Sequence, residues 1–197
     1  AKPVSPSPSL PLSPSRALHV GLVWQGNTAH KGDRFRSIPL SMFEPVAKVP
    51  GVRLVSLQKG YGSEQIEQNR DRFELIEWSD PTDVTAEALV DTAAVMKNLD
   101  LVIAVDTSLA HLAGALGVKV WVAMPLASDW RWLVGREDTP WYPTMRLFRQ
   151  KKLGEWGEVI ERMAEAFRGR PHPCALPAGD GAEGEREPAA ELMVHAV

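Results

Sequence analysis

The sequence predicts an α/β protein with a doubly wound, mostly parallel sheet, and three observations support that prediction. Short segments such as residues 101–105 (LVIAV) are apolar along their whole length, as strands buried on both faces are. Segments with helical spacing of apolar residues separate these strands. The 197 residues are 44% hydrophobic, which is enough to build one domain of ordinary size. Such alternation implies right-handed crossovers and about five or six parallel strands.

Strands and helices alternate through the first part of the domain. In chain order, the predicted elements are a strand over 17–24 (ALHVGLVW), a helix over 41–49, a strand over 52–57 (VRLVSL), a helix over 63–70 and a short strand over 73–78. Ser41 and Glu44 have the spacing of a capping box, which predicts the start of the first helix. Pro45 falls early in that helix, where a proline is tolerated.

The alternation continues through the second part. The predicted elements are a helix over 83–98, a strand over 101–105, a helix over 109–116, strands over 118–124 and 145–148, and an amphipathic helix over 155–167. Apolar residues from Ala88 to Leu99 recur at helical spacing. Gly117 is expected to end the helix that precedes it.

Composition separates two tails from this domain. Residues 1–16 alternate proline with serine, which favours an extended linker, whereas residues 169–197 combine proline, glycine and acidic residues, which favours disorder. The predicted domain therefore covers residues 17–168. His172 and Cys174 in the second tail are too few ligands to predict a metal site.

Charge and hydropathy exclude several kinds of protein. The net charge of −3 argues against a nucleic-acid binder, and the single cysteine excludes an internal disulfide framework. No segment has the run of about 20 apolar residues that crosses a bilayer. The amino terminus also lacks the charged and apolar regions of a secretory signal. We therefore expect a cytoplasmic protein without a transmembrane segment.

The fold predicts where a ligand binds. If the strand order is the common 3-2-1-4-5, the strands at 18–24 and 101–105 are neighbours, and the chain leaves them in opposite directions. A crevice opens at the carboxyl ends of such strands, and ligands bind there. Residues 25–37 and 106–110 are the loops expected to line it.

The first loop, residues 25–37, is basic in a chain that is acidic overall. Lys31, Arg34 and Arg36 outnumber Asp33, and arginine forks suit phosphate oxygens. Two glycines, Gly26 and Gly32, are expected to allow tight turns whose N–H groups also face an anion. The alternative is an ordinary solvated loop in which Asp33 pairs with an arginine.

The second loop begins a helix directly after a buried strand. Asp106 is placed to accept hydrogen bonds from ligand hydroxyls, and Thr107 or Ser108 is expected to cap the helix, whose first N–H groups face the crevice. His111 shares a helix face with Thr107. Taken singly, these residues fit a helix cap and a core histidine; together at a switch point they favour a site for a diphosphate and a sugar.

Other segments are less specific. Lys59 and Glu64 follow the second strand, where they could contact a phosphate and a ribose or be surface charges at a helix start. Trp130, Trp132 and Trp141 could line a ligand, pack a loop against the core or contact another domain, whereas Trp121 within a strand is expected in the core. No motif requires a metal or another cofactor.

The runs VGLVWQGN, HKGDRFRSIPL, VRLVSLQKG, DLVIAVDTSLAHLAGALG and DWRWLVGREDTPWYPTMRLFRQ resemble the carboxyl-terminal, donor-binding half of family-nine, heptosyltransferase-like glycosyltransferases, in particular those fused to tetratricopeptide repeats. The resemblance spans about residues 18–168. It implies a GT-B architecture, in which one Rossmann-like domain binds a nucleotide-diphosphate sugar. It also implies metal-independent transfer with inversion.

The resemblance also implies roles for single residues. The family's motif for the donor's phosphates and sugar matches Asp106, Thr107, Ser108 and His111 of this sequence. Asn27 and Arg36 fall in the family's first donor-side loop, and Glu64 falls at a ribose-contacting position. Arg36 and His111 are the expected catalytic residues, and Lys31 is expected to help Arg36 stabilise the departing diphosphate.

The family's acceptor-side domain, which supplies the expected general base, and any tetratricopeptide repeat are absent from these 197 residues. We therefore expect an incomplete glycosyltransferase that is inactive alone. Two alternatives remain at this point: a noncatalytic interaction module that keeps the fold, and a nucleotide-sugar epimerase with the same architecture.

Overall fold

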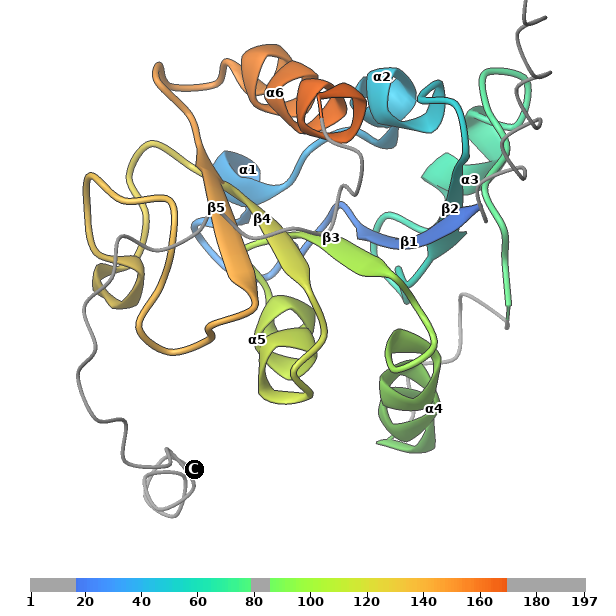
Figure 1. Ribbon diagram of the computed structural model, residues 1–197, viewed down its shortest axis with the longest axis horizontal. Helices are drawn as coiled ribbons and strands as arrows, with labels where there is room; N and C mark the ends of the chain where they lie inside the picture. The colour runs from blue at the N-terminus through green and yellow to red at the C-terminus, as the bar shows by residue number, and fades with distance from the viewer. Residues whose placement is uncertain (1–16, 79–85, 170–197) are drawn as a thin grey trace, which may run out of the picture.

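A parallel sheet forms the centre of the computed structural model, which describes residues 17–78 and 86–169 (Figure 1). Its five strands lie in the order β2-β1-β3-β4-β5 and all neighbouring pairs are parallel. The bounds of the strands are β1 Leu18–Val23, β2 Val52–Ser56, β3 Leu101–Val105, β4 Val120–Met124 and β5 Met145–Arg149. Every residue of β3 and β4 is buried, as their unbroken apolar sequences predict.

Helices cover both faces of the sheet, so the predicted doubly wound α/β class is confirmed. In Figure 1, α6 and α2 lie on one face, and α5 and α4 lie on the other. The helices are α1 Asp33–Arg36, α2 Glu44–Ala47, α3 Gln65–Gln68, α4 Ala86–Met96, α5 Ser108–Ala115 and α6 Trp156–Arg168, with short 3-10 helices at Leu40–Phe43 and Trp130–Trp132. Each face has its own apolar core.

The closing helix α6 is amphipathic as predicted. Its buried side chains recur every three or four residues: Trp156, Val159, Ile160, Met163, Ala164 and Phe167. Trp121 of β4 packs between this helix and β5, with its ring centroid 4.6 Å from that of Phe167 and 5.1 Å from that of Phe148. The prediction that Trp121 belongs to the core is therefore confirmed.

The strand order places a topological switch point beside β1. Val20 of β1 pairs with Leu54 of β2 on one side and with Leu101 of β3 on the other. The chain therefore leaves β1 toward one edge of the sheet and returns to β3 on the opposite side. The predicted neighbourhood of residues 18–24 and 101–105 is confirmed, and their carboxyl ends open at the same edge.

The predicted strand over 73–78 is wrong. Only a single bridge forms there, between Ile76 and Val55, with Ile76 donating to Leu54 O and accepting from Ser56 N–H. It lies beside β2, the position that the predicted order gives to this segment. The indole of Trp78 donates to Ser56 O at 2.8 Å, which is a further contact of this segment with β2.

The predicted helix over 41–49 is divided and has no capping box. A 3-10 turn comes first, and α2 begins only at Glu44, so Pro45 occupies its first turn. The Glu44 carboxylate pairs with Lys48 and Arg72. These two cations lower the pKa of Glu44 to about 2. Because its carboxylate is engaged with them, Glu44 does not bond back to the start of the helix.

The remaining helices begin or end within a few residues of their predicted bounds. Helix α3 is shorter than the predicted 63–70, and residues 79–85, which include the predicted start of the helix over 83–98, lie outside the described residues. Gly117 follows α5 with a φ of +70°, which fits the predicted glycine stop. The predicted tails, including His172 and Cys174, also lie outside the described residues. Among the helices that the structure describes, none is long and apolar enough to span a bilayer.

Candidate functional site

A cavity of about 380 Å³ lies at the carboxyl edge of β1, β2 and β3. The loops after all three strands contribute to its wall, as expected for a switch point. Five residues singled out from the sequence line it: Asn27, Arg36, Lys59, Thr107 and Ser108. The cavity thus brings together loops that are far apart along the chain.

Arg36 joins the first and second predicted loops directly. Its Nη1 donates to the backbone oxygen of Asp106 at 2.7 Å, across a sequence separation of 70 residues. Its Nε donates to Asp33 Oδ1 at 3.2 Å, and Asp33 Oδ2 accepts from the hydroxyl of Ser37 at 2.9 Å. The Arg36 side chain is only 20% exposed, so the guanidinium is fixed at the wall of the cavity.

Of the two glycines in this loop, Gly32 lies in a tight turn, as predicted, which the Asp33 N–H closes by donating to His30 O at 2.9 Å. Neither Gly26 nor Gly32 has a positive φ, and Gly32 precedes α1 with a φ of −90°. Residues other than glycine could therefore adopt the backbone conformations of these two positions. Gly26 is buried and lines the cavity, and its N–H donates to the Ser37 hydroxyl at 3.0 Å.

Thr107 lines the cavity, and its side-chain oxygen lacks a hydrogen-bond partner within the described residues. It occupies the N-cap position of α5 in an extended conformation, with φ −139° and ψ 170°. Its side chain makes no capping bond, so the prediction of a side-chain cap by Thr107 is wrong. Oγ1 is buried without a hydrogen-bond partner.

The side chain of Gln58 joins two of the loops that line the cavity. Gln58 Oε1 accepts from the N–H groups of Trp24 and Gln25, both at 3.1 Å, and its Nε2 donates to the carbonyls of Gln25 and Tyr61. This single buried side chain therefore joins the loops after β1 and β2. Sequence reasoning did not select Gln25, Gln58 or Tyr61. The available signal was the glutamine at the equivalent point after both strands, in WQG and LQKG.

His111 does not line the cavity. Its ring stacks on Trp132 with a centroid distance of 4.9 Å, and its Nδ1 lies 3.1 Å from the Tyr142 hydroxyl. Burial lowers the pKa of His111 below its usual value of 6.5; the charges of Asp106 and Asp129 act in the opposite direction and that of Arg131 in the same one. The structure thus places the predicted catalytic histidine in an aromatic pocket, as a half-buried neutral side chain.

This lowered pKa predicts how stability depends on pH. The unfolded chain binds a proton at His111 more readily than the folded one, so the free energy of unfolding should rise as pH increases from the folded pKa to about 6.5. Urea unfolding of the wild type and of His111→Gln between about pH 5 and pH 8 measures this contribution. We expect a smaller acid-side loss of stability in the variant. Equal pH profiles would contradict the assignment.

Three other predicted site residues also lie outside the cavity wall. Lys31 and Glu64 are exposed, and Glu64 precedes α3. Asp106 takes part through its backbone oxygen, while its half-buried side chain is not among the lining groups. Lys59 does line the cavity, and its Nζ also lies 4.7 Å from the centre of the Trp78 ring. The cavity therefore contains fewer of the predicted charges than the sequence indicated.

The three tryptophans after β4 differ in how far they are exposed, and none of them lines the cavity. Trp132 is fully buried, whereas Trp130 and Trp141 are 74% and 53% exposed. The Arg149 guanidinium holds this loop by donating to Ser128 Oγ and to the carbonyls of Trp132 and Arg136. Of the alternatives for Trp132, packing against the core is the one that the structure supports.

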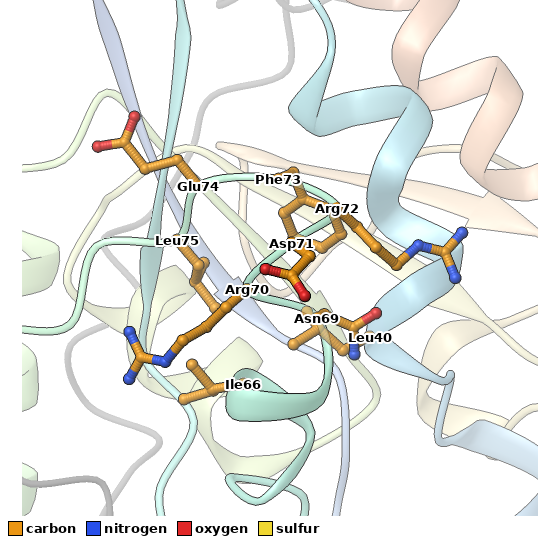
Figure 2. A pocket seen from close by; sticks show the side chains of 9 residues that line it. All are labelled: Leu40, Ile66, Asn69, Arg70, Asp71, Arg72, Phe73, Glu74 and Leu75. Carbon is orange, nitrogen blue, oxygen red and sulfur yellow. The ribbon is translucent and has the colours of Figure 1, made fainter.

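A larger cavity, of about 440 Å³, lies beside the end of α3 (Figure 2). Arg70 and Arg72 point away from one another there (Figure 2). Arg70 pairs with Glu67 and Glu77, and Arg72 with Glu44. Because these cations are already matched by carboxylates, the cavity offers an anion little free positive charge. Among the described residues, no group of three or more His, Cys, Asp or Glu is placed to hold a metal ion.

Comparison with known proteins gives one sequence relative. No protein-family model matches the chain. Protein FlbA of Caulobacter vibrioides is 34% identical over 150 residues, which make up 76% of this chain and 25% of FlbA. The chain thus spans about a quarter of the length of this curated relative.

A solved structure shares the fold. The Escherichia coli heptosyltransferase WaaC with ADP-2-deoxy-2-fluoro heptose matches with a TM-score of 0.52 at 15% identity, over 77% of this chain and 44% of that one. The same enzyme with ADP gives a TM-score of 0.49 at 16% identity, over 79% and 44% of the two chains. The first match shows that this chain shares the fold of the matched part of that enzyme.

Proposed function

We propose that the domain over residues 17–168 binds a nucleotide-diphosphate sugar, as the donor-side part of an inverting, metal-independent glycosyltransferase that uses no cofactor. The observation that carries this proposal is the Arg36–Asp106 hydrogen bond, which closes two distant loops around one cavity at the switch point. Ligands of open α/β sheets bind at such points. The solved relative binds an ADP-heptose analogue, which agrees with this class of ligand.

The donor groups of the cavity suit a diphosphate. Arg36 supplies a guanidinium and Lys59 an ammonium. The first N–H groups of α5 add the positive end of a helix of eight residues. Asn27 and Ser108 add polar side chains at the same wall. These groups balance the ligand's negative charge without requiring a metal ion.

The reaction that follows is a single displacement. An acceptor hydroxyl attacks the anomeric carbon, the bond from that carbon to the diphosphate oxygen breaks, and its electrons remain on the diphosphate. Arg36 and the amino-terminal end of α5 stabilise that leaving group. Lys31 and His111 lie outside the cavity wall, so we assign them no direct contact with the diphosphate.

The general base lies elsewhere in this proposal. The hydroxyl's proton goes to a base on an acceptor-side domain, or on a domain fused to repeats, beyond the chain described here. Compatible with this, FlbA and the heptosyltransferase each extend beyond the matched region. The 197 residues alone are then expected to bind donor and to transfer sugar poorly.

A noncatalytic interaction module with the same fold is the alternative. It is favoured by the exposed apolar side chains of the loop after β4, Trp130 and Val134, which are 74% and 88% exposed. It makes the opposite prediction at the cavity, because a module that has lost the chemistry need not bind nucleotides.

Isothermal titration calorimetry with ADP-, UDP- and GDP-sugars distinguishes the two functions. We expect saturable binding of at least one, with the nucleoside diphosphate alone retaining most of the affinity because the phosphates meet the charged groups. Circular dichroism of the same sample controls for folding. Absence of binding by all three donors to a folded protein would leave the interaction module as the better conclusion.

A further inference from the structure

We infer that Gly26 and Asp33 are positioning residues, which fix the Arg36 guanidinium at the cavity wall. The inference rests on the proposed function, because it concerns how the diphosphate-binding group of that site is held. It gives Gly26 a steric role in place of a conformational one. It also gives Asp33 a role at the ligand site beyond neutralising a surface loop.

The space beside Gly26 is already filled by the side chains of this ion pair. A Cβ at Gly26 would lie 2.4 Å from Asp33 Oδ1 and 2.7 Å from Arg36 Nη2. Real Cβ atoms do not approach so closely, so any larger residue displaces one of the two groups. Since Gly26 has no positive φ, backbone conformation does not explain the glycine. The close approach of the Arg36 guanidinium explains why no side chain fits at this position.

Asp33 is bound on both oxygens, and this orients it. It is 6% exposed; Oδ1 accepts from Arg36 Nε, and Oδ2 accepts from the Ser37 hydroxyl. The same hydroxyl accepts the N–H of Gly26 at 3.0 Å. Backbone, hydroxyl, carboxylate and guanidinium thus form one closed ring of contacts, in which moving one member moves the others.

The ring leaves one nitrogen of Arg36 for a ligand. Nε is used by Asp33 and Nη1 by the Asp106 carbonyl. Within the described residues Nη2 makes no hydrogen bond, and it lies against Gly26, which also lines the cavity. A guanidinium whose other donors are fixed presents this nitrogen in one orientation, so little rotamer entropy is lost on binding.

The test uses Gly26→Ala, which should fold. The added methyl group meets the ends of two side chains, which can move, and the backbone φ is open to alanine. We expect nucleoside diphosphate affinity to fall about tenfold or more, as in Arg36→Ala. The double variant should bind no more weakly than Arg36→Ala alone, because Gly26 acts through Arg36. Gly32→Ala, in the same loop but outside the cavity, is the matched control.

A second readout separates this inference from the function on which it rests. In nitrogen–proton spectra, the Arg36 Nε–H should exchange more slowly than that of the exposed Arg34, and Gly26→Ala or Asp33→Asn should abolish the difference. Equal exchange in the wild type overturns the positioning role whatever binds. Additive losses in the double variant, or unchanged affinity in Gly26→Ala, also overturn it. Slow exchange in a protein that binds no nucleotide defeats the proposed function, and the positioning role with it.

Discussion

Replacing Arg36 with alanine is expected to weaken nucleoside diphosphate binding by about ten- to a hundredfold. The guanidinium is the group that joins both loops of the cavity, through Asp33 on one side and the Asp106 carbonyl on the other. A charge-assisted hydrogen bond to an anion contributes about 1.5–3 kcal/mol, which corresponds to that range. Calorimetry at constant ionic strength measures the change, because salt screens the exposed part of the interaction.

Two variants make the result specific to Arg36. Arg34→Ala removes the same charge from the same loop, but Arg34 is exposed, outside the cavity, and stacked on Phe35 at 4.5 Å. It should leave affinity nearly unchanged. Arg36→Lys keeps the charge without the planar fork and should bind with intermediate affinity. Equal losses in Arg34→Ala and Arg36→Ala would mean that the loop attracts anions by net charge alone.

Replacing Trp132 with alanine is expected to lower the free energy of unfolding by about 3–5 kcal/mol. Trp132 is fully buried, belongs to the core on the α5 face and stacks on His111. Its truncation leaves a cavity between α5 and the loop after β4. Its indole N–H has no partner within the described residues, which offsets part of the packing energy and places the expected loss toward the lower end. Urea unfolding at neutral pH measures the loss.

Trp130→Ala is the matched comparison for Trp132. The two indoles belong to the same 3-10 helix, but Trp130 is 74% exposed. Its removal should change the free energy of unfolding by less than about 0.5 kcal/mol. Similar losses in both variants would contradict the division of this loop into a buried and an exposed tryptophan.

The sheet could be predicted because the sequences of its central strands are apolar along their whole length. Residues 101–105 and 120–124 are apolar at every position, which is typical of strands buried on both faces. The segment 73–78 (FELIEW) is rich in aromatic and branched apolar residues, as strands are, yet only Ile76 pairs with β2. The contacts of this segment with β2, such as that of Trp78 with Ser56, join residues 22 positions apart, and no local pattern records them.

The candidate site could be located from the sequence, but its members could not all be identified. Parallel topology alone brings the ends of β1 and β3 together, so Arg36 and Thr107 meet at one cavity. The direction in which a side chain points from its helix could not be predicted in the same way. His111 shares a helix with Thr107, but its ring turns toward Trp132 and Tyr142, two residues of a later loop. Gln58 was missed because neutral amides leave no charge pattern.

The most direct test of the central claim is a nuclear magnetic resonance titration with a nucleoside diphosphate, followed at the backbone amides. Both loops belong to one anion site, so the signals of Gly26 and Asn27 should shift together with those of Thr107 and Ser108, and all four should report the same dissociation constant. Shifts confined to one of these loops, or centred on residues 69–75 around the other cavity, would contradict a shared diphosphate site.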